Sequence, residues 1–294
     1  MEDSPGPGGR PAPGIVAPVF ETLATGYGLV EGPTADDRGG LFFSDVLGGG
    51  VYRRDASGEI ETVVPKRRGV GGIALHADGG LVVSGRDLQR VHDGRSEVLF
   101  TLDGLPGWND LCTDASGRVY AGSVRFAVFD PDAEVVPGEC WRVDAPGEGR
   151  EIYDGVVHCN GIGVSPDGGT LYHSDTRGRV LVVHDLSADG EVGNRRTFAV
   201  PGPGHPDGLA LDREGGIWVA IAGGGRVDRF LPDGSVERSL EVPANLVTSV
   251  CFAGDDARDL IVVSGDNRED ASRGGSIFRT RGDFAGAPVH PARV

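Results

Sequence analysis

Short apolar runs alternate with turns rich in glycine and aspartate along most of the chain. Runs this short, each ended by turn residues, predict β-strands rather than helices. Six similar runs recur, with their first residues 38 to 52 positions apart: LFFSD from Leu41, LVVSG from Leu81, VYAGS from Val119, LYHSD from Leu171, IWVAI from Ile217 and LIVVS from Leu260. A pattern that recurs at this spacing indicates a fold built from repeated units.

Each run is flanked by further predicted strands. One precedes it, at residues 32–35, 72–75, 110–113, 161–164, 208–211 and 249–252, and another follows it, from Gly50, Leu88, Cys140, Arg179, Arg226 and Gly275. A fourth apolar run often comes next, as at residues 60–64, 97–100 and 197–200. Four short strands in a unit of about 45 residues are typical of a propeller blade. We therefore predict an all-β fold, a six-bladed β-propeller with four-stranded antiparallel blades, over residues 15–294. Residues 19–23 are expected to pair with the last blade and close the ring.

Composition narrows the class of protein. Residues 1–14 contain four prolines and no apolar stretch, so they are expected to form a disordered tail rather than a signal or transit peptide. No apolar run is long enough for a membrane helix. The net charge of −16 argues against nucleic acid or an anionic membrane as a partner. The four cysteines form no CxxC pair, so we expect reduced thiols and a cytoplasmic protein. The expected partner is a small-molecule substrate, and the expected state is a monomer or small homo-oligomer.

One position recurs at the start of the innermost predicted strands. In a propeller these strands line the central channel, so their first residues meet at one of its mouths. The six residues at this ring position are Glu31, Gly71, Asn109, Asn160, Asp207 and Thr248. Their carboxylates and carboxamides suit a hard divalent cation, Ca²⁺ above all, with Mg²⁺, Mn²⁺, Zn²⁺ or Fe²⁺ as alternatives. The competing interpretation is that these side chains only cap backbone groups along a water-filled channel.

The motifs around these positions resemble those of the SMP-30/gluconolactonase/luciferin-regenerating family. The resemblance covers residues 20–288 and rests on GLVEGPTADDRGGLFFSD, WNDLCTDASGRVYAGS, CNGIGVSPDGGTLYHSD, HPDGLALDREGGIWVA and TSVCFAGDDARDLIVVS. It implies a six-bladed propeller with one divalent cation at a channel mouth. It also implies that Glu31, Asn160 and Asp207 are the metal ligands, and that Asn109 holds the substrate or a metal-bound water.

Two departures from the family's pattern concern the substrate. Sugar-lactone hydrolases of the family usually have an arginine two residues before the asparagine matched by Asn109, where this chain has Gly107, followed by Trp108. They also usually have a glutamate shortly after the strand matched by VYAGS, where this chain reads VRFA. Trp108 and Phe126 are therefore expected to make the mouth more apolar, and the substrate is predicted to be less polar than a sugar lactone. Arg125 is the candidate to supply the positive charge of the arginine that this chain lacks.

The leading hypothesis is that a metal-dependent hydrolase opens a lactone or related ester. A divalent cation polarises a carbonyl oxygen and lowers the pKa of bound water. Asp207 is the first candidate for the general base, and His205 and His158 are alternatives because each lies two residues before a predicted ligand. The chain has no GxSxG motif, so a serine nucleophile is not predicted. Two other functions stay open: metal-dependent cyclisation, isomerisation or elimination, and a non-catalytic propeller that serves as a scaffold.

Overall fold

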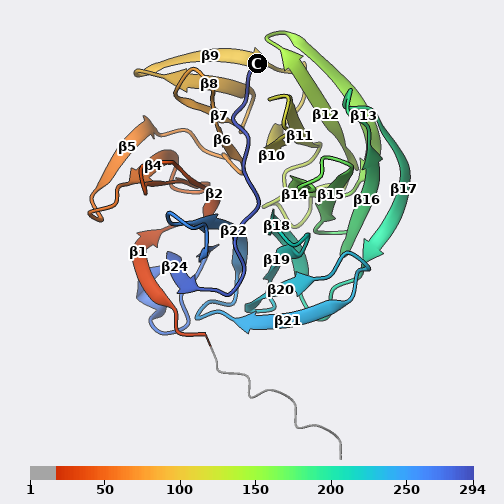
Figure 1. Cartoon of the computed structure of the whole chain (residues 1–294). Coiled ribbons are helices and arrows are strands. Elements are labelled where there is room, and N and C mark those ends of the chain that lie inside the picture. Colours follow the sequence, from red (N-terminus) through yellow and green to blue (C-terminus); the bar gives the residue numbers. More distant parts are fainter. Residues whose placement is uncertain (1–17) are drawn as a thin grey trace, which may run out of the picture.

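A computed structural model of the protein describes residues 18–294, and nearly every element in that range is a β-strand (Figure 1). The strands form six separate four-stranded sheets, with antiparallel pairing between neighbours. The sheets surround a common centre as the blades of a propeller, which confirms the fold predicted from the repeat. The disordered tail predicted for residues 1–14 lies outside the described residues.

Five blades run from the centre outwards in chain order. They are blade 1, β2 (Val30–Ala35), β3 (Leu41–Asp45), β4 (Gly50–Arg54) and β5 (Ile60–Pro65); blade 2, β6 (Ile73–Leu75), β7 (Leu81–Val83), β8 (Leu88–His92) and β9 (Arg95–Phe100); blade 3, β10 (Gly107–Thr113), β11 (Val119–Val124), β12 (Gly138–Ala145) and β13 (Glu148–Val156); blade 4, β14 (Cys159–Val164), β15 (Thr170–Asp175), β16 (Val180–Leu186) and β17 (Val192–Ala199); and blade 5, β18 (His205–Leu211), β19 (Ile217–Ala222), β20 (Arg226–Phe230) and β21 (Val236–Glu241).

Blade 6 joins the two ends of the described chain. Its inner three strands are β22 (Val247–Ala253), β23 (Asp259–Ser264) and β24 (Gly275–Arg281), and its outer strand is β1 (Glu21–Tyr27). The antiparallel pairing of β1 with β24 closes the ring, as predicted, although the strand begins two residues later than expected. Closure of this kind leaves no open gap between the first and last blades.

The core consists of six apolar clusters, and each of them lies between two adjacent blades. Successive side chains of a strand point to opposite faces of its sheet. In β3, Leu41 and Phe43 therefore pack against blade 6, whereas Phe42 packs against blade 2. Both faces of an inner sheet are covered in this way, which explains why the predicted strands read as continuous apolar runs.

The chain ends in a segment that the repeat did not predict. This C-terminal segment, residues 282–294, crosses the centre of the ring (Figure 1). The backbone N–H of Ala287 donates to the carbonyl oxygen of Leu211, and that of Ala292 to Leu75, each at 2.8 Å. Leu211 and Leu75 are the last residues of their inner strands, so the segment lies at the end of the channel opposite the ring positions.

The cysteines and the helical content agree with the sequence. Cys112, Cys140, Cys159 and Cys251 are free thiols, and none is exposed. Burial raises the pKa of each thiol, so all four are protonated at neutral pH. Over residues 18–294 the helical content is one three-residue turn, η1 (Ala271–Arg273), and no helix there is long and apolar enough to cross a membrane.

Candidate metal centre

The predicted ligands lie where inner strands depart from regular pairing. The register of β2 shifts at Glu31, that of β14 at Asn160 and that of β18 at Asp207. An irregularity of this kind bends a strand and redirects a side chain. Blades 1, 4 and 5 each therefore present one oxygen-bearing side chain from an inner strand.

These three side chains are buried, and their electrostatics are unfavourable without a cation. Glu31, Asn160 and Asp207 are 8%, 6% and 6% exposed. Burial first, and then the negative charges of Asp207 and Asp110, raise the pKa of Glu31 well above its usual range. Burial and the charge of Asp110 raise the pKa of Asp207 in the same direction. Among the described residues, Asp207 Oδ1 has no hydrogen-bond partner. A buried carboxylate oxygen without a donor fits a ligand to a cation.

The predicted ligand set joins an amide oxygen to two carboxylates. Over residues 18–294, no group of three or more His, Cys, Asp or Glu side chains is arranged to hold a metal ion. An amide oxygen from Asn160 would complete a set of three oxygen donors, which suits a hard cation such as Ca²⁺.

The residue before each predicted ligand is held by a side chain from the preceding blade. The carbonyl oxygens of these three residues accept hydrogen bonds from Thr248 Oγ1 to Val30 (2.6 Å), from Asn109 Nδ2 to Cys159 (2.9 Å) and from Thr176 Oγ1 to Pro206 (2.8 Å). These bonds fix the backbone from which the ligands project. The repeat had already selected Thr248 and Asn109, but it could not show that they contact the neighbouring blade. Nothing in the sequence pattern singles out Thr176.

Glycines that follow two of the ligands allow adjacent inner strands to approach each other. A Cβ atom on Gly161 would lie 2.6 Å from the carbonyl oxygen of Asp207. A Cβ atom on Gly208 would collide with Ser249 in the next blade. The glycines of the CNG and PDG motifs are therefore needed for close packing around the channel, since no larger residue fits without displacing backbone.

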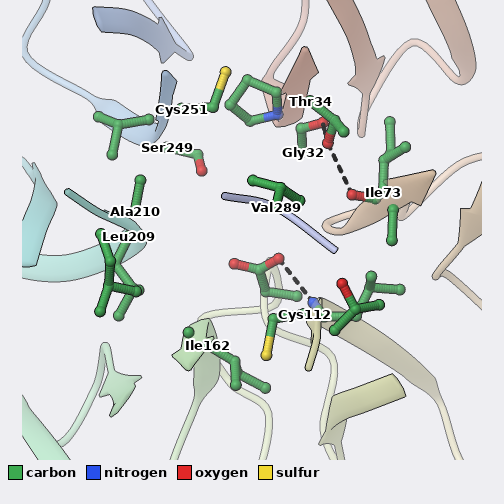
Figure 2. Close-up of a pocket in the computed structure, with 18 of the residues that line it drawn as sticks. Gly32, Thr34, Ile73, Cys112, Ile162, Leu209, Ala210, Ser249, Cys251 and Val289 are labelled. Atoms are coloured by element: carbon green, nitrogen blue, oxygen red, sulfur yellow. Dashed lines mark hydrogen bonds between the residues drawn. The ribbon is translucent and has the colours of Figure 1, made fainter. Parts of the chain in front are cut away.

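Asn109 and Asp110 occupy different levels of the channel. The side-chain oxygen of Asn109 lies where a Cβ atom of Gly71 would be, which explains why blade 2 has no side chain at the ring position. Asp110 lines a cavity of about 170 Å³ that reaches from the inner strands to the C-terminal segment. Figure 2 shows Val289 of that segment among the side chains around this cavity. Burial raises the pKa of Asp110 to about 7.

Trp108 requires a correction. The sequence suggested that it lines the mouth, but its side chain is 2% exposed and belongs to the apolar cluster between blades 2 and 3. Its ring centre lies 5.8 Å from that of Phe100 and 6.3 Å from that of Trp141. The register of β10 shifts after Trp108, so the neighbouring Asn109 leaves the regular alternation while Trp108 stays in the core.

Phe126 and Arg125 lie near the mouth but differ from the expectation. Phe126 is buried, with the ring of His158 at its edge (5.9 Å between ring centres) and the guanidinium of Arg177 over its face. Arg125 is engaged by Glu139, with its Nε 2.9 and 3.0 Å from the two carboxylate oxygens. Neither residue therefore presents a free apolar or cationic surface.

The two candidate histidines differ in their surroundings. Nδ1 of His205 lies 3.0 Å from the carbonyl oxygen of Thr176. Because a carbonyl oxygen only accepts, Nδ1 is the donor in this contact. Burial, and then the charge of Arg177, lower the pKa of His158 to about 4. His158 is therefore neutral at neutral pH and is a weak base.

Comparison with known proteins supplies the remaining evidence. A family model described as "SMP-30/Gluconolactonase/LRE-like region" matches residues 29–266. The chain is 33% identical over 263 residues to 6-deoxy-6-sulfogluconolactonase of Pseudomonas putida, covering 84% of this chain and 88% of that protein. It is 30% identical over 277 residues to pentonolactonase XacC of Haloferax volcanii, covering 92% of each. A crystal structure of the calcium-binding protein regucalcin from Agrobacterium tumefaciens superposes with a TM-score of 0.82 at 26% identity, over 95% of this chain and 98% of that one.

Proposed function

The chain belongs to the SMP-30/gluconolactonase/LRE-like family, and on that premise we propose that it is a hydrolase that opens a sugar-acid lactone with the help of one divalent cation. The observation that carries the proposal is the buried pair Glu31 and Asp207, whose burial is unfavourable unless a cation compensates it. The names of two relatives, a sulfogluconolactonase and a pentonolactonase, support a lactone as the substrate.

Glu31, Asn160 and Asp207 would hold the cation. Three protein ligands leave coordination positions open for water and substrate, as catalysis at a metal requires. When bound, the cation supplies a Lewis acid that polarises the lactone carbonyl and acidifies a water molecule. Ca²⁺ is our first choice because all three donors are oxygens, with Mg²⁺, Mn²⁺, Zn²⁺ and Fe²⁺ as alternatives.

The side chains of the chain itself would move the proton. Hydrolysis adds water to the acyl carbon, breaks the ring C–O bond and transfers one proton from the water to the departing alkoxide oxygen. We assign the proton transfer to the carboxylate of Asp207, with Nε2 of His205 as the alternative, because the contact with Thr176 uses the other ring nitrogen. His158 is the weakest candidate, since its pKa is lowered to about 4.

The substrate we propose is polar. The expectation of a less polar substrate depended on Trp108 and Phe126 lining the mouth. Trp108 lies in the core instead, and Phe126 is covered by Arg177 and His158. Asn109, whose amide group donates to Cys159, keeps its side-chain oxygen for a hydroxyl of a sugar lactone.

The test begins with metal identification by mass spectrometry on the purified protein. A pH-indicator screen across aliphatic, aromatic and sugar lactones then follows, before and after treatment with a chelator. We expect turnover of sugar lactones, its loss on chelation and its recovery with one divalent cation. Glu31→Gln should abolish both cation binding and turnover. A protein that binds a cation at Glu31 yet hydrolyses no lactone in the screen would contradict the proposed activity.

A further inference from the structure

Two arginines flank Phe126 at the rim of the mouth, and they differ in their partners. Arg125 is neutralised by Glu139, with its Nη2 2.9 Å from a carboxylate oxygen. Arg177 lies over the ring of Phe126, with its guanidinium carbon 4.8 Å from the ring centre. Among residues 18–294, no carboxylate lies within salt-bridge distance of Arg177, and its residue surface is exposed. Arg177 is therefore a cation at this rim without an acidic partner.

The turn that carries Arg177 is fixed between two ligand-bearing strands. The backbone N–H of Thr176 donates to the carbonyl oxygen of His158 at 3.1 Å, and its hydroxyl donates to Pro206 at 2.8 Å. His158 lies two residues before Asn160, and Pro206 lies directly before Asp207. Arg177, the next residue after Thr176, is thus held at the rim between these two ligands.

The way Arg177 is held leaves its hydrogen-bonding edge free. A guanidinium that stacks on an aromatic ring uses its face, while its N–H groups lie in the plane and point outwards. These N–H groups match the two oxygens of a carboxylate or sulfonate.

We propose that Arg177 binds an anionic substituent, a carboxylate or a sulfonate, at the end of the substrate remote from the lactone carbonyl. The proposal rests on the proposed lactonase function and adds the substrate class: lactones of sugar acids that carry a second acidic group. Phe126 holds the guanidinium in position, and the turn at Thr176 sets its distance from the reacting end.

The test compares lactones that differ only in this substituent. kcat/KM is measured for gluconolactone, for the matching lactone with a terminal carboxylate and for the one with a terminal sulfonate. We expect the wild-type enzyme to prefer the anionic lactones. Arg177→Gln should lower the anionic-to-neutral ratio of kcat/KM about 10- to 100-fold, the range for a hydrogen bond to a charged group. Arg177→Lys, which keeps the charge but loses the planar fork, should give an intermediate ratio.

Arg179→Gln is the matched control. Arg179 lies on the same turn and is also exposed, and the substitution removes the same charge. We expect this variant to change the ratio by less than about threefold, because a screened surface charge acts weakly at a distance. An equal fall in both variants would overturn the proposal in favour of a general electrostatic effect.

A binding measurement separates this proposal from the proposed activity. Calorimetry is carried out with glucarate and gluconate, the open-chain acids with and without the second carboxylate. Wild-type protein should bind glucarate more tightly, and Arg177→Gln should remove that difference. If no lactone is hydrolysed but this difference is found, the lactonase assignment fails and the anion site stands. If lactones are hydrolysed and the anionic-to-neutral ratio is the same in wild type and Arg177→Gln, the anion site fails alone.

Discussion

The hydroxyl of Thr176 donates a 2.8 Å hydrogen bond to the carbonyl oxygen of Pro206, the residue directly before Asp207. The bond joins blade 4 to blade 5 at the point where the inner strand β18 shifts register. Thr248 makes the corresponding bond to Val30, the residue before Glu31. The positions of the two carboxylates therefore depend on neutral hydroxyl groups of neighbouring blades.

Replacing these hydroxyls should weaken cation binding. We expect Thr176→Val and Thr248→Val to raise the Kd for Ca²⁺ about tenfold, because partners that orient ligands typically contribute 10- to 100-fold in affinity. Calorimetric titration of the metal-free protein measures this change. Tyr52→Phe is the control: it removes a 3.0 Å bond to the carbonyl oxygen of Gly49, in the turn between β3 and β4, where no ligand is predicted. It should cost about 1 kcal/mol of stability with an unchanged Kd. Equal Kd values in all three variants would contradict the positioning role.

Removing one buried carboxylate should separate the stability of the metal-free protein from its cation binding. We expect metal-free Glu31→Gln to be at least as stable to urea as wild type, because the substitution relieves the repulsion between Glu31 and Asp207. Wild type should gain about 2.7 kcal/mol at a Ca²⁺ concentration 100 times the Kd. The variant should gain little. Full stabilisation of Glu31→Gln by Ca²⁺ would place the cation elsewhere.

Within the C-terminal segment, a substitution at Ala292 should lower stability, whereas one at Val289 should not. Ala292 is completely buried in the apolar cluster between blades 2 and 3, whereas Val289 is 73% exposed. We expect Ala292→Asp to lower the free energy of unfolding by about 3 kcal/mol or more, since it buries a carboxylate among apolar side chains. Val289→Asp should stay within about 0.5 kcal/mol of wild type. Urea titrations check both values, and a similar small effect at the two positions would show that the segment is not packed.

Stability should fall below about pH 6.5 because of His173. Burial lowers the pKa of this histidine to about 3 in the folded protein, against about 6.5 when unfolded. A lowered pKa means that the unfolded chain takes up the proton first. The contribution of His173 to the free energy of unfolding is therefore constant above pH 6.5, and it becomes increasingly unfavourable as the pH falls towards 3. Between pH 7 and pH 5, we expect wild type to lose about 2 kcal/mol of stability relative to His173→Asn, which has no titratable group at this position. A difference that is constant over this range would contradict the lowered pKa.

Periodic features of the structure could be predicted, because every blade needs apolar side chains on both faces of its inner strands. The run from Leu41 in blade 1 and that from Leu260 in blade 6 both became second strands, since both fill the apolar space between blades. The same repeat led to Glu31, Asn160 and Asp207. Their roles as ligands stay predictions. The structure adds that all three side chains are buried and that one carboxylate oxygen of Asp207 has no hydrogen-bond partner among the described residues.

Features that depend on a single irregularity could not be predicted. Whether Trp108 or Asn109 faces the channel is decided by the register shift in β10, which leaves no mark in the apolar pattern. Arg177 lies in a turn, where the sequence shows a charged residue but not the aromatic ring beneath it. Residues 282–294 show no apolar period because they form isolated bridges to His76 and Asp212, at the ends of inner strands, rather than a strand of their own.

The C-terminal segment lies across one end of the central channel, at the end opposite Glu31 and Asp207. A ligand that enters beside the ring positions therefore meets the chain's own last residues at the far end. Substitutions there can alter the depth of the channel without changing any predicted ligand.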